Sequence, residues 1–171
     1  MISDALARWN RLSAEEAENE IVACCGSRAW ARQMANRRPI ADAAVLLSAS
    51  DDVWRSLSEQ DWMEAFQSHP RIGASRAEPG VDRRSKAWSA DEQRNVGDDG
   101  DTVKAALEEG NHEYERRFGR IFLVCATGKT GAEILEILRH RLHNDRATEM
   151  REAAEQQRQI TRLRLQRWLS E

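Results

Sequence analysis

The sequence predicts an all-α protein, a single-domain irregular helical bundle with one short extended buried segment near residues 121–126. Ala, Glu, Arg and Leu dominate the composition and strong β-formers are scarce, which favours helices. The chain has 171 residues, a length that suits one domain, so we expect a single domain over residues 1–171. Charged residues make up 32% and hydrophobic residues 40%, a composition typical of a globular protein with a well-solvated surface.

Helix-forming stretches alternate with breaks in the first half of the chain. We predict helices over residues 13–25, 27–36, about 40–48 and about 56–67. Pro39 separates the second from the third, because proline cannot continue a helix. The polar stretch 73–87 contains the turn signal Pro79-Gly80 and is predicted to be a loop, with helix resuming near Ser89. Capping boxes, in which Ser or Thr precedes Glu by three positions, are predicted at Ser13/Glu16, Ser56/Glu59, Ser89/Glu92 and Thr130/Glu133.

The second half of the chain contains the extended segment between longer helices. A helical stripe over residues 102–118 is formed by Val103, Leu107, Gly110, Tyr114 and Phe118. Gly119 is the predicted C-terminal cap of that helix. The run IFLVCA, residues 121–126, has the composition of a buried strand, but no second strand candidate exists to pair with it. We therefore predict an extended segment threading a helical core, followed by helices over 130–142 and 146–169.

Charge, cysteine content and hydropathy exclude several classes of protein. The net charge of −3 gives no reason to expect a nucleic acid partner. The three cysteines form neither a C-x-x-C pair nor a metal-binding spacing, which favours a reducing compartment. No signal peptide is visible, the ending WLSE is not a peroxisomal signal, and the longest apolar run is too short to span a bilayer. We expect a cytoplasmic enzyme or binding protein without membrane association.

Three short motifs are misleading. In ATGKT, the glycine that a phosphate-binding loop requires five positions before Gly128 is replaced by Leu123. HEYER begins like a zinc-protease helix, but the second histidine position is Arg116. RHRLH, residues 139–143, is predicted to be a solvated helix face, with its charges near a helix C-terminus that favours them.

His69 precedes Pro70 at the end of a predicted amphipathic helix. Proline cannot continue the helix and pushes the preceding residue into an extended conformation. The imidazole is therefore placed on a restricted backbone, where it is either an ordinary loop histidine or a proton donor held in place.

The stretch SADEQ, Ser89 to Gln93, combines a capping box with candidate ligand-binding residues. The pattern by itself indicates a helix start. Because a helix N-terminus presents free N–H groups and a positive dipole end, it also suits an anionic ligand.

The last predicted helix has an arginine on its apolar side. At about 100° per residue, its broad apolar sector is formed by Met150, Ala153, Ile160, Leu163, Leu165 and Trp168. Arg164 falls near the middle of this sector with Gln157 close to it. The far side carries Arg151, Arg158 and Arg162. Either the Arg164 guanidinium extends to solvent, or it points inward and meets a carboxylate or a bound anion.

Five motifs in order carry a resemblance to a known family: HPRIG, SADEQ, NHEYERRFGRIFLVCATGKT, EILRHRLHND and ITRLRLQRWL. Together they resemble the OHCU decarboxylases, the 2-oxo-4-hydroxy-4-carboxy-5-ureidoimidazoline decarboxylases of uric acid degradation. The resemblance runs from His69 to the end of the chain and is looser over residues 1–65, where only NRRPI is similar. It implies an all-α fold and an enzyme with no metal and no organic cofactor.

The resemblance also implies a set of site residues. His69 matches the family's catalytic histidine, and Glu92 and Arg164 match further active-site groups. The implied substrate-binding residues are Pro70, Ser89, Gln93 and the main chain of Phe122, Leu123, Val124, Cys125 and Ala126. An extended backbone at 121–126 would expose N–H and C=O groups to a ligand.

The implied reaction is a cofactor-independent decarboxylation of a small molecule that gives (S)-allantoin. Two alternatives stay open: a non-catalytic helical ligand-binding or interaction protein, and a decarboxylase of a related ureido or imidazole acid. The family includes dimers, so the resemblance leaves a homodimer open.

Overall fold

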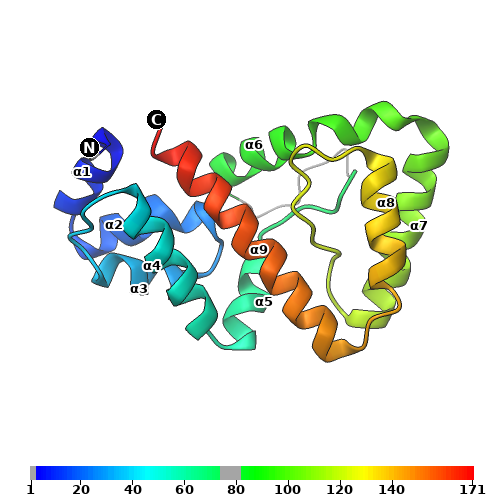
Figure 1. Cartoon of the computed structure of the whole chain (residues 1–171), viewed down its shortest axis with the longest axis horizontal. Helices are drawn as coiled ribbons and strands as arrows, with labels where there is room; N and C mark the ends of the chain where they lie inside the picture. The colour runs from blue at the N-terminus through cyan, green and yellow to red at the C-terminus, as the bar shows by residue number, and fades with distance from the viewer. Residues whose placement is uncertain (1–2, 74–81) are drawn as a thin grey trace. The chain divides into compact units, whose positions relative to one another are not determined.

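The computed structural model describes residues 3–73 and 82–171, and the regular elements of this part are all helical (Figure 1). This confirms the predicted all-α class. The α-helices are α1 (Asp4–Arg11), α2 (Ala14–Ile21), α3 (Arg28–Asn36), α4 (Ala43–Ser56), α5 (Glu59–Gln67), α6 (Arg83–Glu92), α7 (Gly100–Phe118), α8 (Gly131–Arg141) and α9 (Arg146–Trp168). Two 3-10 helices, η1 (Val22–Cys24) and η2 (Arg94–Asp99), complete the order. None of the helices in the described part is long and apolar enough to cross a membrane.

The chain divides into two compact units. We call residues 1–65 with 158–171 the N-terminal unit, and residues 66–157 the central unit. Helix α9 contributes its first half to the central unit and its second half to the N-terminal unit. The expected single domain over residues 1–171 stays a prediction.

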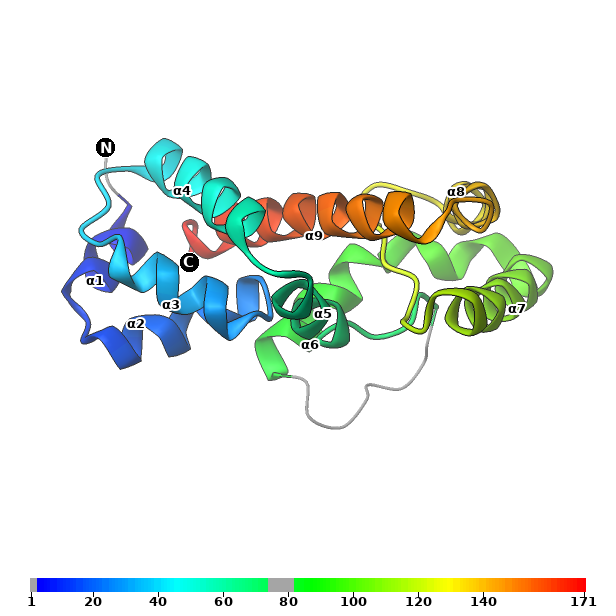
Figure 2. The same cartoon turned by 90° about the horizontal axis from the view of Figure 1, so that it is seen from below.

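Buried tryptophans form the centre of the N-terminal unit, in which α2 packs beside α3 (Figure 2). The rings of Trp9 and Trp168 meet edge to face with centroids 6.0 Å apart. On another side of α9, Arg158 and Arg162 both donate to Asp51, at 3.1 and 2.8 Å. Two of the three arginines predicted on the far side of the last helix thus have a carboxylate partner on α4.

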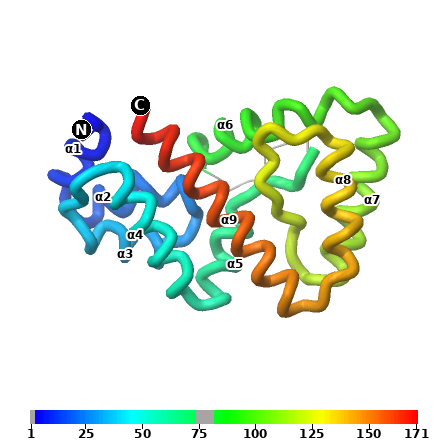
Figure 3. Tube along the Cα trace, viewed as in Figure 1, coloured from blue at the N-terminus to red at the C-terminus, as the bar shows by residue number. Residues whose placement is uncertain are grey.

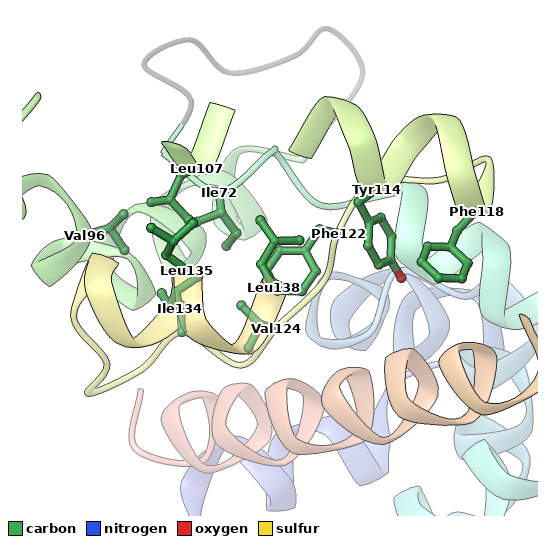
Figure 4. Close-up of a cluster of buried hydrophobic side chains, with 11 residues drawn as sticks. Ile72, Val96, Leu107, Tyr114, Phe118, Phe122, Val124, Ile134, Leu135 and Leu138 are labelled. Atoms are coloured by element: carbon green, nitrogen blue, oxygen red, sulfur yellow. The ribbon is translucent and has the colours of Figure 1, made fainter. Parts of the chain in front are cut away.

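The core of the central unit lies between α7 and α8 (Figure 4). Its apolar residues are Ile72, Val96, Leu107, Tyr114, Phe118, Phe122, Val124, Ala126, Ile134, Leu135 and Leu138. A Cβ atom at Gly110 would lie 2.6 Å from a methyl carbon of Leu138, so this glycine lets the two helices approach closely. Gly119 ends α7 in the left-handed conformation with φ 72°, which confirms it as the predicted cap.

Residues 121–126 are extended and non-helical, and Phe122 to Ala126 are buried, as predicted (Figure 3). Side chains replace the missing strand partner. Arg141 Nη1 donates to the Leu123 carbonyl at 2.6 Å, and the Cys125 N–H donates to Gln156 Oε1 at 2.9 Å. Lys129 Nζ donates to the Cys125 carbonyl at 2.9 Å. A buried peptide group needs such partners, so these three side chains hold the segment in the core.

The capping boxes Ser13/Glu16 and Thr130/Glu133 are confirmed, but the predicted box at Ser56/Glu59 is wrong. Helix α4 begins after the cap Asp42 and continues beyond residue 48 to Ser56, whose hydroxyl donates to the Val53 carbonyl. The next helix begins later, where Ser58 and Asp61 bond each other's groups reciprocally. The capping pair of α5 is therefore Ser58 with Asp61, two positions later than predicted, with aspartate in place of glutamate.

The predicted loop over residues 73–87 is wrong for residues 83–87, and the predicted helix start near Ser89 is wrong. Asp82 caps α6 by accepting from the N–H groups of Arg84 and Ser85, so residues 83–87 are already helical. Ser89 therefore lies inside α6 and is buried, and it is not a cap. Sequence periodicity missed this start because the first turn, RRSK, is wholly polar. Pro79-Gly80 lies outside the described residues.

Two further expectations about single side chains are wrong. Within the motif RHRLH, Arg139 and His140 are exposed as predicted, but Arg141 is buried because it lies three positions after buried Leu138 on the core face of α8. In α9, Leu163 is 40% exposed although it lies near the apolar sector, because the buried face is centred on Arg164, Thr161 and Leu165.

Candidate active site

His69 follows the last turn of α5, and its own N–H still donates to the Phe66 carbonyl at 3.3 Å. Its side chain is only 6% exposed. Nε2 of the imidazole lies 2.7 Å from Oε1 of Gln157, which is fully buried in α9. The prediction of a histidine held at a helix exit is thus confirmed in its geometry, and the partner that holds it is an amide.

The segment after His69 is fastened from three directions within the central unit. The Gly73 N–H donates to Gln93 Oε1 at 3.0 Å, and Asn111 Nδ2 of α7 donates to the Ile72 carbonyl at 3.2 Å. Arg71 forms a two-pronged ion pair with Glu115, at 2.5 and 3.1 Å. The His-Pro segment is therefore an ordered part of the unit, and Gln93 links it to the end of α6.

Ser89, Glu92 and Gln93 lie along the last turn of α6 and at its C-cap. Ser89 is buried, whereas Glu92 and Gln93 are half-buried. The expectation that this stretch offers a helix N-terminus to an anion is wrong, because a helix C-terminus presents carbonyl oxygens and the negative end of the dipole. Such an end suits the N–H groups of a ligand.

The extended segment offers fewer free backbone groups than its conformation suggested. Side chains already occupy the Leu123 carbonyl and both peptide groups of Cys125, and the Ala126 carbonyl accepts from the Lys129 N–H. Within the described residues, the peptide groups of Phe122 and Val124 receive no such bond.

Arg164 is 1% exposed and lies in the N-terminal unit. Its Nη1 donates to the Ala23 carbonyl at 3.3 Å. The inward direction predicted from periodicity is confirmed, and the alternative with the guanidinium in solvent is wrong. Burial raises the pKa of the nearby Cys25 thiol to about 12, although Arg164 acts against this shift by favouring the thiolate. The structure groups the other predicted site residues within the central unit.

Sequence reasoning did not assign a role to several buried polar groups. Gln157 was expected near Arg164, seven positions away on the same helix face, but its contact with His69 joins residues 88 positions apart and leaves no local signal. A second cluster is centred on Glu149, which is fully buried. Its carboxylate accepts from Arg141, Tyr114 and Asn144. Burial, followed by the bond to Glu149, raises the pKa of Tyr114.

The described residues contain no group of three His, Cys, Asp or Glu side chains that could hold a metal ion. All three cysteines are buried as free thiols.

A model of the OHCU decarboxylase family matches residues 10–166. The chain belongs to the OHCU decarboxylase family. This confirms the resemblance seen in the five sequence motifs, and the match also extends over much of residues 1–65, where those motifs were sparse.

Two relatives of this chain are named as proteins of uric acid degradation. The chain is 34% identical over 163 residues to the uric acid degradation bifunctional protein TTL of Arabidopsis thaliana, and 24% identical over 168 residues to the uric acid degradation bifunctional protein of Bacillus sp. (strain TB-90). Each match covers 94% of this chain, but the chain spans only 49% and 31% of the two relatives.

Solved structures share the fold. The crystal structure of an OHCU decarboxylase in the presence of (S)-allantoin superposes with a TM-score of 0.76 and 32% identity, covering 90% of this chain and 99% of that one. An (S)-allantoin synthase structure, at 16% identity and a TM-score of 0.71, shows the same fold over 95% of this chain and 53% of its own.

Proposed function

We propose that this chain decarboxylates 2-oxo-4-hydroxy-4-carboxy-5-ureidoimidazoline and releases (S)-allantoin. The observation that supports this most strongly is the similarity to an OHCU decarboxylase crystallised in the presence of (S)-allantoin, of which this chain covers 99%. The Arabidopsis and Bacillus relatives are longer, so the proposal concerns this domain's reaction alone.

The substrate chemistry explains how the reaction proceeds without a cofactor. The carboxylate is attached to a ring carbon next to a C=N bond, so the electron pair of the breaking C–C bond moves into that C=N. Carbon dioxide leaves and the nitrogen of the former C=N bond takes up a proton, which gives an enol. The enol hydroxyl then loses its proton to become a carbonyl, and the ureido-bearing carbon gains a proton. Protonation on one face of that carbon gives the (S) product.

In this proposal His69 donates or relays the proton to carbon. An imidazole has an ordinary pKa near 6.5, so this residue type exchanges protons readily at neutral pH. The support for His69 is its burial and its fixed position beside Gln157. A buried group is shielded from bulk water, which protects a stereospecific proton transfer from competing solvent.

The remaining assignments follow the family motifs. Glu92 orients ring and ureido N–H groups, Ser89 and Gln93 bind polar edges of the ligand, and Pro70 contacts it. Main-chain contacts come from the segment Phe122 to Ala126, chiefly from Phe122 and Val124, whose peptide groups have no hydrogen bond within the described residues. The family pattern assigns Arg164 to the ligand's negative charge. The support from the fold is the C-terminal position of Glu92 and Gln93 on α6, whose carbonyl-rich end suits N–H donors.

The test is to incubate the purified chain with freshly generated substrate and to follow the circular dichroism of the product. We expect a dichroic signal of (S)-allantoin that rises faster than the spontaneous decay, which gives a racemate. His69→Ala should abolish this signal while far-UV circular dichroism keeps its helical shape. Racemic product at the spontaneous rate would remove the proposed activity, and a fully active His69→Ala variant would remove the role of His69.

The alternatives predict different results in the same assay. A non-catalytic binding protein would be stabilised thermally by allantoin yet would not change the rate. A decarboxylase of a related acid would leave this substrate to decay and act on a ureido or imidazole analogue. A cytoplasmic location and a homodimer remain predictions.

A further inference from the structure

The contact between His69 and Gln157 involves a residue, Gln157, that lies outside the five family motifs. It joins the exit of α5 to the middle of α9, and both side chains are buried within the central unit. At 2.7 Å it is as short as a strong hydrogen bond. An amide oxygen can only accept a hydrogen bond, so the hydrogen of this contact belongs to Nε2 of His69.

We propose that Gln157 is a positioning residue that fixes the tautomer and the ring orientation of His69 for the proposed decarboxylation. With its hydrogen on Nε2, the neutral ring carries its lone pair on Nδ1. Nδ1 is then the nitrogen that takes up the proton and passes it to the ureido-bearing carbon, while Nε2 keeps its hydrogen throughout the cycle.

The chemistry of the partner suits this role. A carboxylate in this position would favour the charged imidazolium, because an opposite charge nearby stabilises a cation. A neutral amide orients the ring without favouring either protonation state through a full charge, so the ring can gain and lose a proton in each turnover. Gln157 is fully buried, so the side chain that contacts the ring is itself enclosed by protein.

The inference rests on the proposed function, and its first measurement is independent of activity. The side-chain ¹⁵N signals of histidine distinguish a hydrogen on Nε2 from one on Nδ1. The sequence has four histidines, and the other three, His112, His140 and His143, are exposed, so a His69→Ala sample identifies the signal of His69. We expect the parent chain to show the Nε2–H form at His69.

Two substitutions at Gln157 separate its bond from its volume. Gln157→Met keeps a similar size without the acceptor. We expect the His69 spectrum to change to mixed tautomers and kcat to fall by about 10- to 100-fold with little change in KM, because ring orientation is lost. In Gln157→Glu, the ionised carboxylate can only accept a hydrogen bond, so His69 should keep its hydrogen on Nε2. Gln166→Met is the matched control, the same change at an exposed position of α9, and should leave both the spectrum and kcat unchanged.

The outcomes distinguish the inference from the proposed function. A folded Gln157→Met variant with the parental His69 spectrum, or with parental kcat, would overturn the inference while the enzyme assignment stands. If Gln157→Met does not fold, loss of the Nε2 hydrogen in Gln157→Glu overturns it instead. An inactive parent chain overturns the proposed function and the catalytic part of this inference together, and is recognised because the spectra need no substrate.

Discussion

The central unit encloses two buried polar clusters, one around Glu149 and one around His69, and their side chains are held by different kinds of partner. Around Glu149, a full negative charge is enclosed by Arg141, by the Tyr114 hydroxyl at 2.6 Å and by Asn144 at 3.0 Å. In the other cluster, Nε2 of His69 contacts the neutral amide of Gln157. Both clusters use the first half of α9, and both are shielded from solvent.

This difference in partners bears on the role of each cluster, because the Glu149 cluster stabilises the fold and the His69 cluster belongs to the proposed active site. A buried carboxylate that accepts bonds from several donors is held in one position, since losing any partner is costly. Arg141 also donates to the Leu123 carbonyl and stacks over Phe122 at 4.7 Å, so the Glu149 cluster holds the extended segment in place. An imidazole is the side chain whose ordinary pKa lies nearest neutrality, so in the proposed function the His69 cluster serves proton transfer.

The largest effect on stability should come from removing the carboxylate of the first cluster. Glu149→Leu leaves Arg141 buried without its ion-pair partner, and we expect a loss of about 3–5 kcal/mol in the free energy of unfolding. Urea denaturation measures this value. The double variant Arg141→Met/Glu149→Leu should recover a large part of the loss, because an apolar pair carries no unpaired charge. A double variant as unstable as the single one would contradict this account.

Removing one neutral donor from the same carboxylate should cost less. Tyr114→Phe keeps the aromatic packing on Phe118 and Phe122 but loses the hydrogen bond to Glu149. We expect a loss of about 1.5–3 kcal/mol, the usual range for a hydrogen bond to a charged group. The same urea titration checks it, and an unchanged midpoint would show that Glu149 is satisfied without the tyrosine.

In the N-terminal unit, burial keeps a different group, the Cys25 thiol, in its neutral form. Burial raises the pKa of Cys25 from 9.0 to about 12, so above pH 9 the unfolded chain loses a proton that the folded chain keeps. Stability should therefore fall as pH rises from about 9 to 12, by up to about 1.4 kcal/mol per pH unit from this thiol. Cys25→Ala should flatten the decline in urea midpoints over this range. An equally steep decline in that variant would assign it to other groups.

The smallest effect is expected at Arg120, in which two guanidinium nitrogens are buried without an acceptor in the described part of the chain. Arg120 stacks against Phe66 and Phe118, but within the described residues its Nε and Nη2 atoms are buried without a hydrogen-bond partner. In Arg120→Met, the lost cation–π contact is offset by removal of this desolvated charge, so we expect a change below about 1 kcal/mol. Arg141→Met is the matched comparison and should be far more destabilising. Equal losses in the two variants would remove the distinction between a paired and an unpaired arginine.

Much of the fold could be predicted because its signals are local. The stripe on α7, the cap Gly119, the proline break at Pro39 and the non-helical run 121–126 each depend on residues close together in sequence. The start of α6 was missed because Asp82 caps a polar first turn without apolar periodicity, and this error placed Ser89 at the wrong end of its helix. Arg141 was misjudged because its partner Glu149 lies on the next helix.

The sequence by itself determined the helical class, the family and the residue types available for proton transfer, because short-range spacing and motif order are written along the chain. It also determined that Arg164 points inward, since helical periodicity sets the direction of a side chain. Only the tertiary structure decided which side chain holds His69, which carbonyls of the extended segment are already occupied, and which arginine is paired in the core. Most of these outcomes depend on contacts between different elements of the fold, such as His69 with Gln157 and Arg141 with Leu123, and helical spacing does not encode such contacts.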